Sequence, residues 1–307
     1  MRLHIHGVHV PNRKNTAELA ALRLPIPETV EIPMSMHIGA PAIPVVKPGD
    51  SVRVGQLIGK AGGFVSAPVY ASISGTVKKI GQQVGSGGRL MQTVVIAADG
   101  KQEPDPDLKP PKLDTMQDFL DAVRESGMVG LGGAGFPTVV KLTVKNLEQV
   151  QAVIINGAEC EPYITSDTRT MLDRSDELME GARLVQHFLQ VRRVIFAIED
   201  NKPRCIQLYR KLTKDEDGME VCALKSLYPQ GGEKVLIYNT IGQDRAGGQA
   251  TARRRRDRAQ LHHARQHRPL LQYRHAAGRK VHHGRRLGRR QAQERHRSHR
   301  HEARGCV

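Results

Sequence analysis

The sequence predicts an α/β protein that consists of a small β module, an α/β domain and a basic tail without a core. Three observations support this order. Short apolar runs between Gly- and Pro-rich turns fill residues 37–102. A Pro-rich linker follows at 103–113, and apolar runs then alternate with amphipathic ones over 114–242. The tail, residues 243–307, has almost no apolar periodicity and is expected to be disordered, whereas residues 1–36 are expected to form an extended segment.

In the β module, strands are expected at 42–46, 56–58, 76–80 and 93–96, because these apolar runs lie between glycine-containing turns. The phrases VKPGDSVRVGQLIGK and SAPVYASISGTVKKI resemble the barrel-sandwich pattern of biotinyl and lipoyl domains. In that family a hairpin between the two phrases presents a modified lysine, but residues 61–65 (AGGFV) hold none here. We therefore interpret the module as structural or as a docking surface, in preference to a group carrier.

The α/β domain is expected to begin after the stiff, charged linker EPDPDLKPPKL. Asp114 can cap its first helix, and Gly127 can end it. Further strands are expected at 150–155, 194–198 and 219–224, and further helices at 173–190, 203–213 and 232–241. This alternation is typical of an α/β domain with a largely parallel sheet.

Charge and cysteine content exclude several classes of protein. The net charge is +16, but residues 243–307 hold 19 of the 47 Lys and Arg and only 4 of the 31 Asp and Glu, so the rest of the chain is almost neutral. The four cysteines form no C-x-x-C pair, which argues against a disulfide framework or a cysteine-ligated metal site. No stretch approaches 18 apolar residues, so no transmembrane segment is expected in this chain.

The stretch GLGGAGFPT contains G-x-G-x-x-G, formed by Gly130, Gly132, Gly133 and Gly135. Glycines let backbone N–H groups approach an anion, and Lys141 could meet a phosphate as a point charge. A tight glycine turn that only packs on a neighbour is the alternative. A Rossmann-type dehydrogenase is a second alternative, but it requires a strand directly before the glycines, where this sequence predicts a helix.

Two further loops carry polar groups next to a strand or a helix. The stretch NGAECEPY follows an expected buried strand and brings Asn156, Glu159 and Glu161 to the ligand-binding edge of the sheet. Its alternative role is an acidic loop that caps the next helix. The stretch YPQGGEK again leads glycines into a helix, here with Gly232 and Glu233.

Together, GLGGAGFPT, INGAECEPY and YPQGGEKVLIYNTIG resemble the C subunit of the Rnf ion-translocating electron-transport complex, which is related to the flavin- and NADH-binding subunit of respiratory complex I. The resemblance covers residues 37–242. A diol-utilisation reductase of bacterial microcompartments shares these motifs. The resemblance implies that the glycine loop (Gly130, Gly132, Gly133, Gly135) and Lys141 hold the FMN phosphate. It also implies contacts to flavin and NADH from Phe136, Asn156, Glu159, Glu161, Gly232 and Glu233, and no catalytic side chain.

The same resemblance implies a place and partners for the chain. Electrons would pass between NADH and FMN and leave through iron–sulfur clusters toward ferredoxin. The subunit would lie on the cytoplasmic face of the membrane, held there by the other subunits of the complex. This chain lacks the cysteine-rich segment that ligates the clusters in the family, so we expect it to carry no cluster and no metal ligands.

The tail departs from the family after Gly242. Read one base later with synonymous codons, it yields a sensible strand-and-loop sequence that resembles the family's own continuation. We therefore expect a frameshift, with an α/β domain that is truncated and impaired. The alternative is a genuine basic arm that binds RNA or anionic lipid. Because the tail has a single tyrosine and no aromatic platform for bases, we expect no specific nucleic-acid partner.

Overall fold

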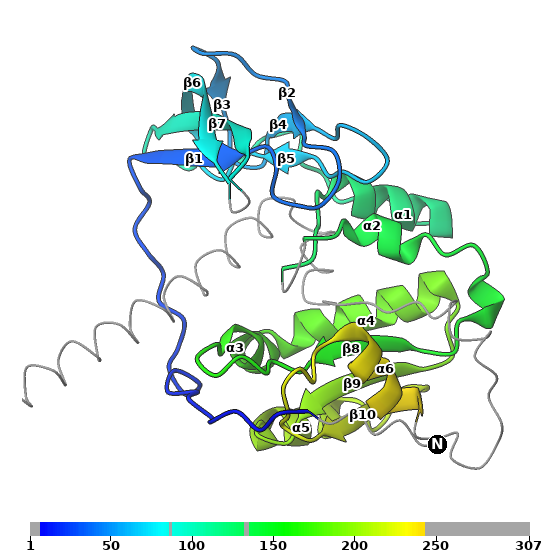
Figure 1. The fold of residues 1–307 in the computed structure, drawn as a ribbon. Coiled ribbons are helices and arrows are strands. Elements are labelled where there is room, and N and C mark those ends of the chain that lie inside the picture. The colour runs from blue at the N-terminus through cyan, green and yellow to red at the C-terminus, as the bar shows by residue number, and fades with distance from the viewer. Residues whose placement is uncertain (1–6, 86–87, 132–134, 243–307) are drawn as a thin grey trace, which may run out of the picture. The chain divides into compact units, whose positions relative to one another are not determined.

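A computed structural model of the chain describes residues 7–85, 88–131 and 135–242 (Figure 1). Gly132, Gly133 and the tail that was expected to be disordered lie outside the described residues. The described residues form two compact units: 24–145, and 7–23 together with 146–242. The predicted boundary at the 103–113 linker would instead place 114–145 with the α/β domain.

The first unit contains two antiparallel sheets. Strands β1 (Thr29–Pro33), β7 (Leu90–Ala98), β6 (Gly75–Val84) and β3 (Ser51–Val52) form one sheet in that order, and β2 (Ile43–Pro44), β4 (Leu57–Lys60) and β5 (Val69–Tyr70) form the other. All four predicted strands are present. Strand β1 was not predicted; it lies in the segment expected to be merely extended, and it pairs along its whole length with β7.

The β unit is held together by one buried apolar cluster from both sheets, and its members are Ile32, Met34, Ala42, Val52, Ile58, Val69, Ala71, Ile73, Val77, Val94 and Ile96. At the start of β6, buried and exposed residues alternate, as expected of a strand with one buried face, whereas residues 93–96 of β7 are all buried. Gly75 marks the closest backbone approach. Its φ is +155°, and a Cβ there would lie 1.8 Å from the carbonyl oxygen of Ala97, so only glycine fits.

Two helices complete this unit. Helix α1 (Met116–Glu125) buries Phe119, Leu120 and Val123, and helix α2 (Thr138–Leu142) packs beside it. The expectation that Asp114 caps α1 was wrong. Thr115 is the cap, because its hydroxyl accepts from the Asp118 amide while the Asp118 carboxylate accepts from the Thr115 amide. Gly127, with φ +68°, follows the end of α1, and a Cβ there would meet the Pro68 carbonyl oxygen at 2.4 Å.

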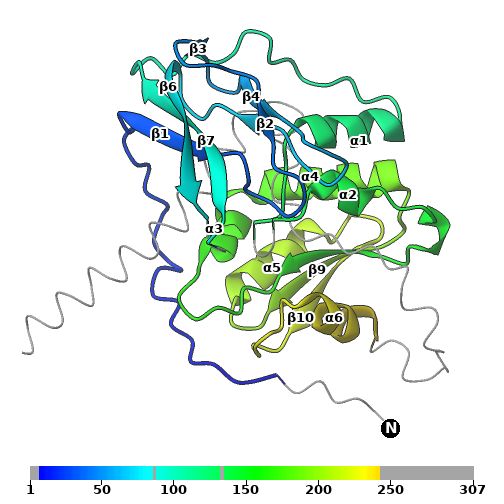
Figure 2. The ribbon, with the colours of Figure 1, turned by 45° about the horizontal axis from the view of Figure 1, so that its top comes forward.

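The second unit is an α/β domain with a parallel sheet, as predicted. Its strand order is β10 (Met219–Leu224), β9 (Val194–Glu199), β8 (Val153–Gly157). Its helices are α3 (Ser166–Asp173), α4 (Ser175–Leu189), α5 (Pro203–Leu212) and α6 (Glu233–Ile237), with a short helix at Leu147–Gln149 and a π-helical turn at Tyr238–Gly242 (Figure 2). The second helix was predicted as 173–190, and α3 before it was not predicted.

Helices cover both faces of this sheet, since successive strand residues point to opposite sides. Ile154, Ile195 and Ala197 pack with Leu236 of α6 on one face. Ile155, Phe196 and Ile198 line a small apolar void with Met171 of α3 and Leu178 of α4 on the other. Because the three strands are parallel, their carboxyl ends lie at one edge, where the predicted site residues of this unit also lie.

No helix among the residues that the structure describes is both long enough and apolar enough to span a membrane.

Candidate functional site

Asn156 lies at the carboxyl end of β8 and joins two of the three predicted loops. Its Nδ2 donates to the Gly231 carbonyl oxygen at 3.1 Å, and its Oδ1 accepts from the Ala158 amide at 3.0 Å. The loops approach so closely that a Cβ on Gly231 would lie 2.6 Å from the Ala158 carbonyl oxygen. The buried Asn156 amide therefore fixes the start of the loop 156–163 against the loop 228–233.

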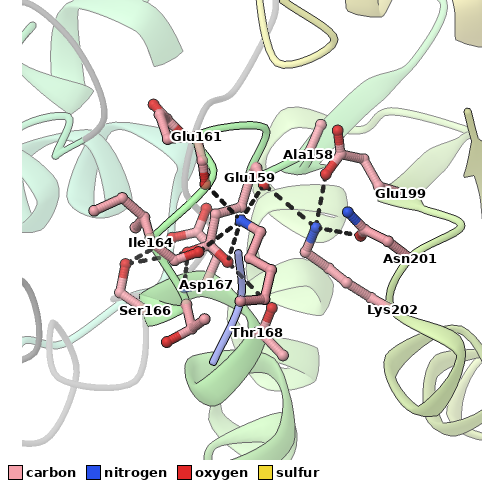
Figure 3. Close-up of polar contacts among 12 residues, drawn as sticks. Ala158, Glu159, Glu161, Ile164, Ser166, Asp167, Thr168, Glu199, Asn201 and Lys202 are labelled. Atoms are coloured by element: carbon pink, nitrogen blue, oxygen red, sulfur yellow. Dashed lines mark hydrogen bonds and ion pairs between the residues drawn. The ribbon is translucent and has the colours of Figure 1, made fainter. Parts of the chain in front are cut away.

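Glu159 is 2% exposed, and its carboxylate caps helix α3. Its Oε1 accepts from the Asp167 amide at 2.7 Å and from the Ser166 hydroxyl, and its Oε2 accepts from the Thr168 hydroxyl at 3.1 Å (Figure 3). A carboxylate at a helix N-terminus satisfies amides that have no partner within the helix and is favoured by the helix dipole. The loop NGAECEPY therefore caps the next helix through Glu159, which is the alternative role that its sequence suggested.

Two lysines lie beside Glu159, and the sequence analysis singled out neither. Lys14, from the N-terminal segment, is 11% exposed; its Nζ donates to the carbonyl oxygens of Glu159 and Ile164, both at 2.6 Å, and of Glu161 at 2.9 Å. Lys202 Nζ lies 2.7 Å from Glu199 Oε2 and donates to Asn201 Oδ1 at 2.8 Å and to the Glu159 carbonyl oxygen at 3.5 Å (Figure 3). No local sequence signal distinguishes either lysine.

The outer part of the loop 156–163 is accessible. Glu161 and Tyr163 are exposed, and Cys160 between the two glutamates is half-buried. Burial raises the pKa of the Cys160 thiol, against a hydrogen bond from the Gly231 amide that lowers it. The loop therefore offers one accessible carboxylate, that of Glu161. The side chains of Asn156 and Glu159 form hydrogen bonds with other groups of the chain.

The loop 228–233 leads into α6 as predicted. Gly232 is the N-cap of α6, and Glu233 lies in its first turn. Gln230 is buried and accepts from Asn239 Nδ2 at 3.1 Å. Tyr228 pairs with Val8 through two hydrogen bonds of 2.8 Å, so the N-terminal segment contacts this loop as well.

The glycine loop belongs to the first unit. Backbone hydrogen bonds join residues 128–130 to residues 136–138 on either side of it, and these two segments are here called its neck. The Gly130 amide donates to the Phe136 carbonyl oxygen at 2.9 Å, and the Thr138 amide donates to the Met128 carbonyl oxygen at 2.9 Å. Gly135 has φ +68°, and a Cβ there would lie 2.7 Å from the Met36 carbonyl oxygen. The half-buried Phe136 therefore lies where the two sides of the loop are joined by backbone hydrogen bonds.

Lys141 lies in α2 and points back toward this neck. Its Nζ would be 3.3 Å from a Cβ placed on Gly130. Helix α2 has only five residues, so its dipole contributes little, and an anion here would depend on backbone amides and Lys141. The segment before the glycines contains helix α1, and the parallel strands lie in the other unit, so the structure gives no support to the Rossmann alternative.

One unit thus brings together Asn156, Glu159, Glu161, Gly232 and Glu233 at the carboxyl edge of the sheet. Gly130, Gly135, Phe136 and Lys141 belong to the other unit. Over 7–85, 88–131 and 135–242, no group of three or more His, Cys, Asp or Glu side chains could hold a metal ion.

Two family models match the chain. The RnfC barrel sandwich hybrid domain matches residues 3–101, and the Nuo51 FMN-binding domain matches residues 123–254. These matches confirm the fold class predicted from the sequence.

Several curated relatives are also similar. The C subunit of the Na+-translocating ferredoxin:NAD+ oxidoreductase complex of Acetobacterium woodii is 41% identical over 248 residues, which are 79% of this chain and 56% of the relative. Its counterpart in the proton-translocating complex of Clostridium ljungdahlii is 42% identical over 246 residues, 79% of this chain and 54% of the relative. The chain spans about half the length of these relatives.

Among solved structures, the NAD+-reducing NiFe-hydrogenase in its air-oxidised state matches with a TM-score of 0.40 and 18% identity, over 56% of this chain and 32% of that chain. Its H2-reduced state matches with a TM-score of 0.34 and 23% identity, over 40% and 23% of the two chains.

Proposed function

Because the chain belongs to the family of C subunits of Rnf-type electron-transport complexes, we propose that it binds FMN and a nicotinamide nucleotide as part of an oxidoreductase. FMN, when bound, would accept a hydride from NADH and release the electrons one at a time. The chain's own residues would bind and orient the two nucleotides. No side chain is proposed to act in catalysis.

The neck of the glycine loop carries this proposal. Lys141 Nζ lies 3.3 Å and the Phe136 amide nitrogen 3.6 Å from the point that a Cβ on Gly130 would occupy. A cation and a backbone amide therefore lie close to the start of the glycine loop, and the Phe136 carbonyl oxygen lies 3.6 Å from the same point. This combination fits the dianionic phosphate of FMN, since amides supply directed hydrogen bonds and lysine supplies a point charge. Gly132 and Gly133 complete the proposed loop.

The loops at the carboxyl edge of the sheet in the α/β unit carry the other proposed contacts. Glu161 is the exposed carboxylate that can accept from ribose or flavin donors. Asn156 and Glu159 contribute by holding the loop, since their side-chain oxygens accept from backbone amides of the chain. Phe136 would lie near the nicotinamide ring, and Gly232 with Glu233 would face the dinucleotide.

We also propose the setting of this activity. The relatives are subunits of ion-translocating complexes, and two of them are named for ferredoxin and NAD+. The proposed partners are therefore the other subunits of a membrane complex, with ferredoxin reached through iron–sulfur clusters outside this chain. The proposed location is the cytoplasmic face of the membrane.

The test is FMN and NADH binding by the full-length chain. We expect flavin fluorescence to change on titration with FMN, and anaerobic NADH to bleach the flavin absorbance of the loaded protein. Lys141→Met should raise the Kd for FMN about tenfold or more, because a charge-assisted hydrogen bond is lost.

Lys145→Met is the matched control, since Lys145 is exposed and lies four residues after Lys141, beyond the end of α2. It should leave the FMN affinity unchanged. Equal affinities for the Lys141→Met and Lys145→Met chains would refute the phosphate assignment, and an unsubstituted chain that takes up no FMN would refute the proposed function.

A further inference from the structure

Residues 7–18, here called the N-terminal strap, lie along the α/β unit although they are far from it in sequence (Figure 1, dark blue). Several polar contacts join the strap to this unit. Val8 pairs with Tyr228, and the Thr16 hydroxyl bonds the Thr165 hydroxyl at 2.6 Å. Glu18 forms an ion pair with Arg204. The strap thus touches two of the loops at the proposed nucleotide-binding edge, 156–165 and 228–233.

Lys14 joins the strap to the loop that contains the buried Glu159. Its ammonium has three N–H donors and meets three carbonyl oxygens of one loop, those of Glu159, Glu161 and Ile164, at 2.6–2.9 Å. The Glu159 carboxylate lies 3.6 Å away and supplies the opposite charge. Three carbonyls from a six-residue stretch can converge on one atom only if the backbone curls around it.

Removing the Lys14 ammonium from water costs free energy, and its contacts with the loop offset this cost. Desolvation lowers the pKa of Lys14, and the nearby Glu159 charge acts in the opposite direction. A side chain with this flexibility would normally stay in water, so its burial at the loop is specific to the fold. In a trans peptide the N–H points opposite to the preceding C=O, so Lys14 also sets the direction of the Cys160 and Thr165 amides.

We propose that Lys14 is a positioning residue, which holds the loop 159–164 in the conformation that presents Glu161 to the nicotinamide nucleotide. This inference rests on the proposed function, and it adds a residue from the other end of the sequence to that site. Lys14 itself is not proposed to touch the nucleotide, because its donors are directed at the three carbonyl oxygens.

The test compares Lys14→Met with Arg13→Met in the full-length chain. Both remove one positive charge from neighbouring positions, but Arg13 is exposed, whereas the Lys14 side chain is only 11% exposed. Hydrogen exchange of peptides that cover 158–165 reports loop order, and titrations with FMN and then NADH report binding. Thr16→Val, which removes only the bond to Thr165, serves as a milder variant in case Lys14→Met does not fold.

For Lys14→Met we expect faster hydrogen exchange in 158–165. The Kd for NADH should rise about tenfold, because Glu161 would no longer be held in position to contact the nucleotide. The Kd for FMN should change less than about threefold, because the glycine loop and Lys141 anchor its phosphate. Arg13→Met should alter none of these, and Thr16→Val should shift them in the same direction as Lys14→Met by a smaller factor.

Three results would overturn the inference: unchanged exchange, faster exchange with unchanged NADH affinity, or an equal loss of FMN and NADH affinity with faster exchange across the whole unit. The last result would assign Lys14 to general stability. If the unsubstituted chain binds neither nucleotide, the proposed function fails and this inference with it, and that failure is recognised before any substitution is made.

Discussion

Breaking the Glu199–Lys202 pair should remove a large part of the stability of the α/β unit. Glu199 ends the central strand β9 and is 1% exposed; Lys202, 3% exposed, lies 2.7 Å from it at the start of α5. Lys202→Met keeps the length of the side chain but leaves the carboxylate without its nearest cation. A buried charge that loses its partner costs about 3–5 kcal/mol. That is a major fraction of the roughly 5–15 kcal/mol that stabilises a typical protein.

The structure also predicts that a second substitution restores most of this loss. Glu199→Gln combined with Lys202→Met leaves no buried charge unpaired. Only the hydrogen bonds from Lys202 to Asn201 and to the Glu159 carbonyl oxygen remain lost, which amounts to about 1–3 kcal/mol in total. The double variant should therefore be more stable than Lys202→Met alone, with a coupling energy of about 2 kcal/mol or more.

Equilibrium urea unfolding of the full-length chain measures this cycle. Circular dichroism is the suitable signal, because the chain has no tryptophan. The matched control is the pair Arg193–Glu220, which has the same 2.7 Å separation but is 42% and 49% exposed. Its cycle should give about 0–1 kcal/mol. Additive losses in the Glu199 and Lys202 variants, or equal coupling in the two pairs, would refute the reasoning from burial.

Two further predictions concern the same unit. Burial raises the pKa of the Cys205 thiol from 9.0 to about 11, so the unfolded chain loses this proton first. Its contribution to stability should be fully present below pH 9 and fall by up to about 1.4 kcal/mol per pH unit as pH rises toward 11. Cys205→Ala should flatten that part of the urea-unfolding profile, and a profile identical to that of the unsubstituted chain would contradict the assignment. Gly231→Ala should weaken NADH binding, because its Cβ would lie 2.6 Å from the Ala158 carbonyl oxygen, whereas Gly242→Ala, with its nearest atom at 3.4 Å, should not; the two titrations compared directly decide this.

The sequence predicted those helices and strands whose buried residues recur at regular spacing within the element itself. Strands β8 and β9 begin with continuous apolar runs, β10 is apolar apart from Glu220, and α4 and α5 carry apolar residues at helical spacing, so the pattern predicted these elements. Helix α3 has no such pattern. Its sequence SDTRTMLD buries only Thr168 and Met171, and a carboxylate from outside the helix, that of Glu159, caps it.

Strand β1 was missed for a related reason. Its residues TVEIP bury one side chain fully, and its partner β7 lies about sixty residues later in the chain. Strand propensity depends on such cross-strand neighbours more than on the segment itself. The five residues alone therefore cannot distinguish an extended segment from an edge strand that completes a four-stranded sheet.

The sequence predicted which residues lie at the candidate site. It did not predict which of the carboxylates cap a helix and which stay exposed. A carboxylate after a buried parallel strand lies at the ligand-binding edge whether it binds a ligand or caps a helix, so Glu159 and Glu161 were equivalent in the sequence. The structure separates them, because Glu159 is buried on the α3 amides and beside Lys14, whereas Glu161 is exposed.

The difference between the two glutamates depends on partners that the sequence could not supply. Lys14 lies 145 residues before Glu159, and Lys202 lies 43 residues after it. With Glu199 and Glu159, these lysines form a buried group of two acids and two bases whose charges balance at the carboxyl edge of the sheet. A balanced group can be buried without net charge, and it fixes the loops before any nucleotide arrives. The negative charge that remains accessible on the loop 156–163 is then that of Glu161, which is why the proposed contact to the nucleotide is assigned to this residue and the preorganisation to Lys14.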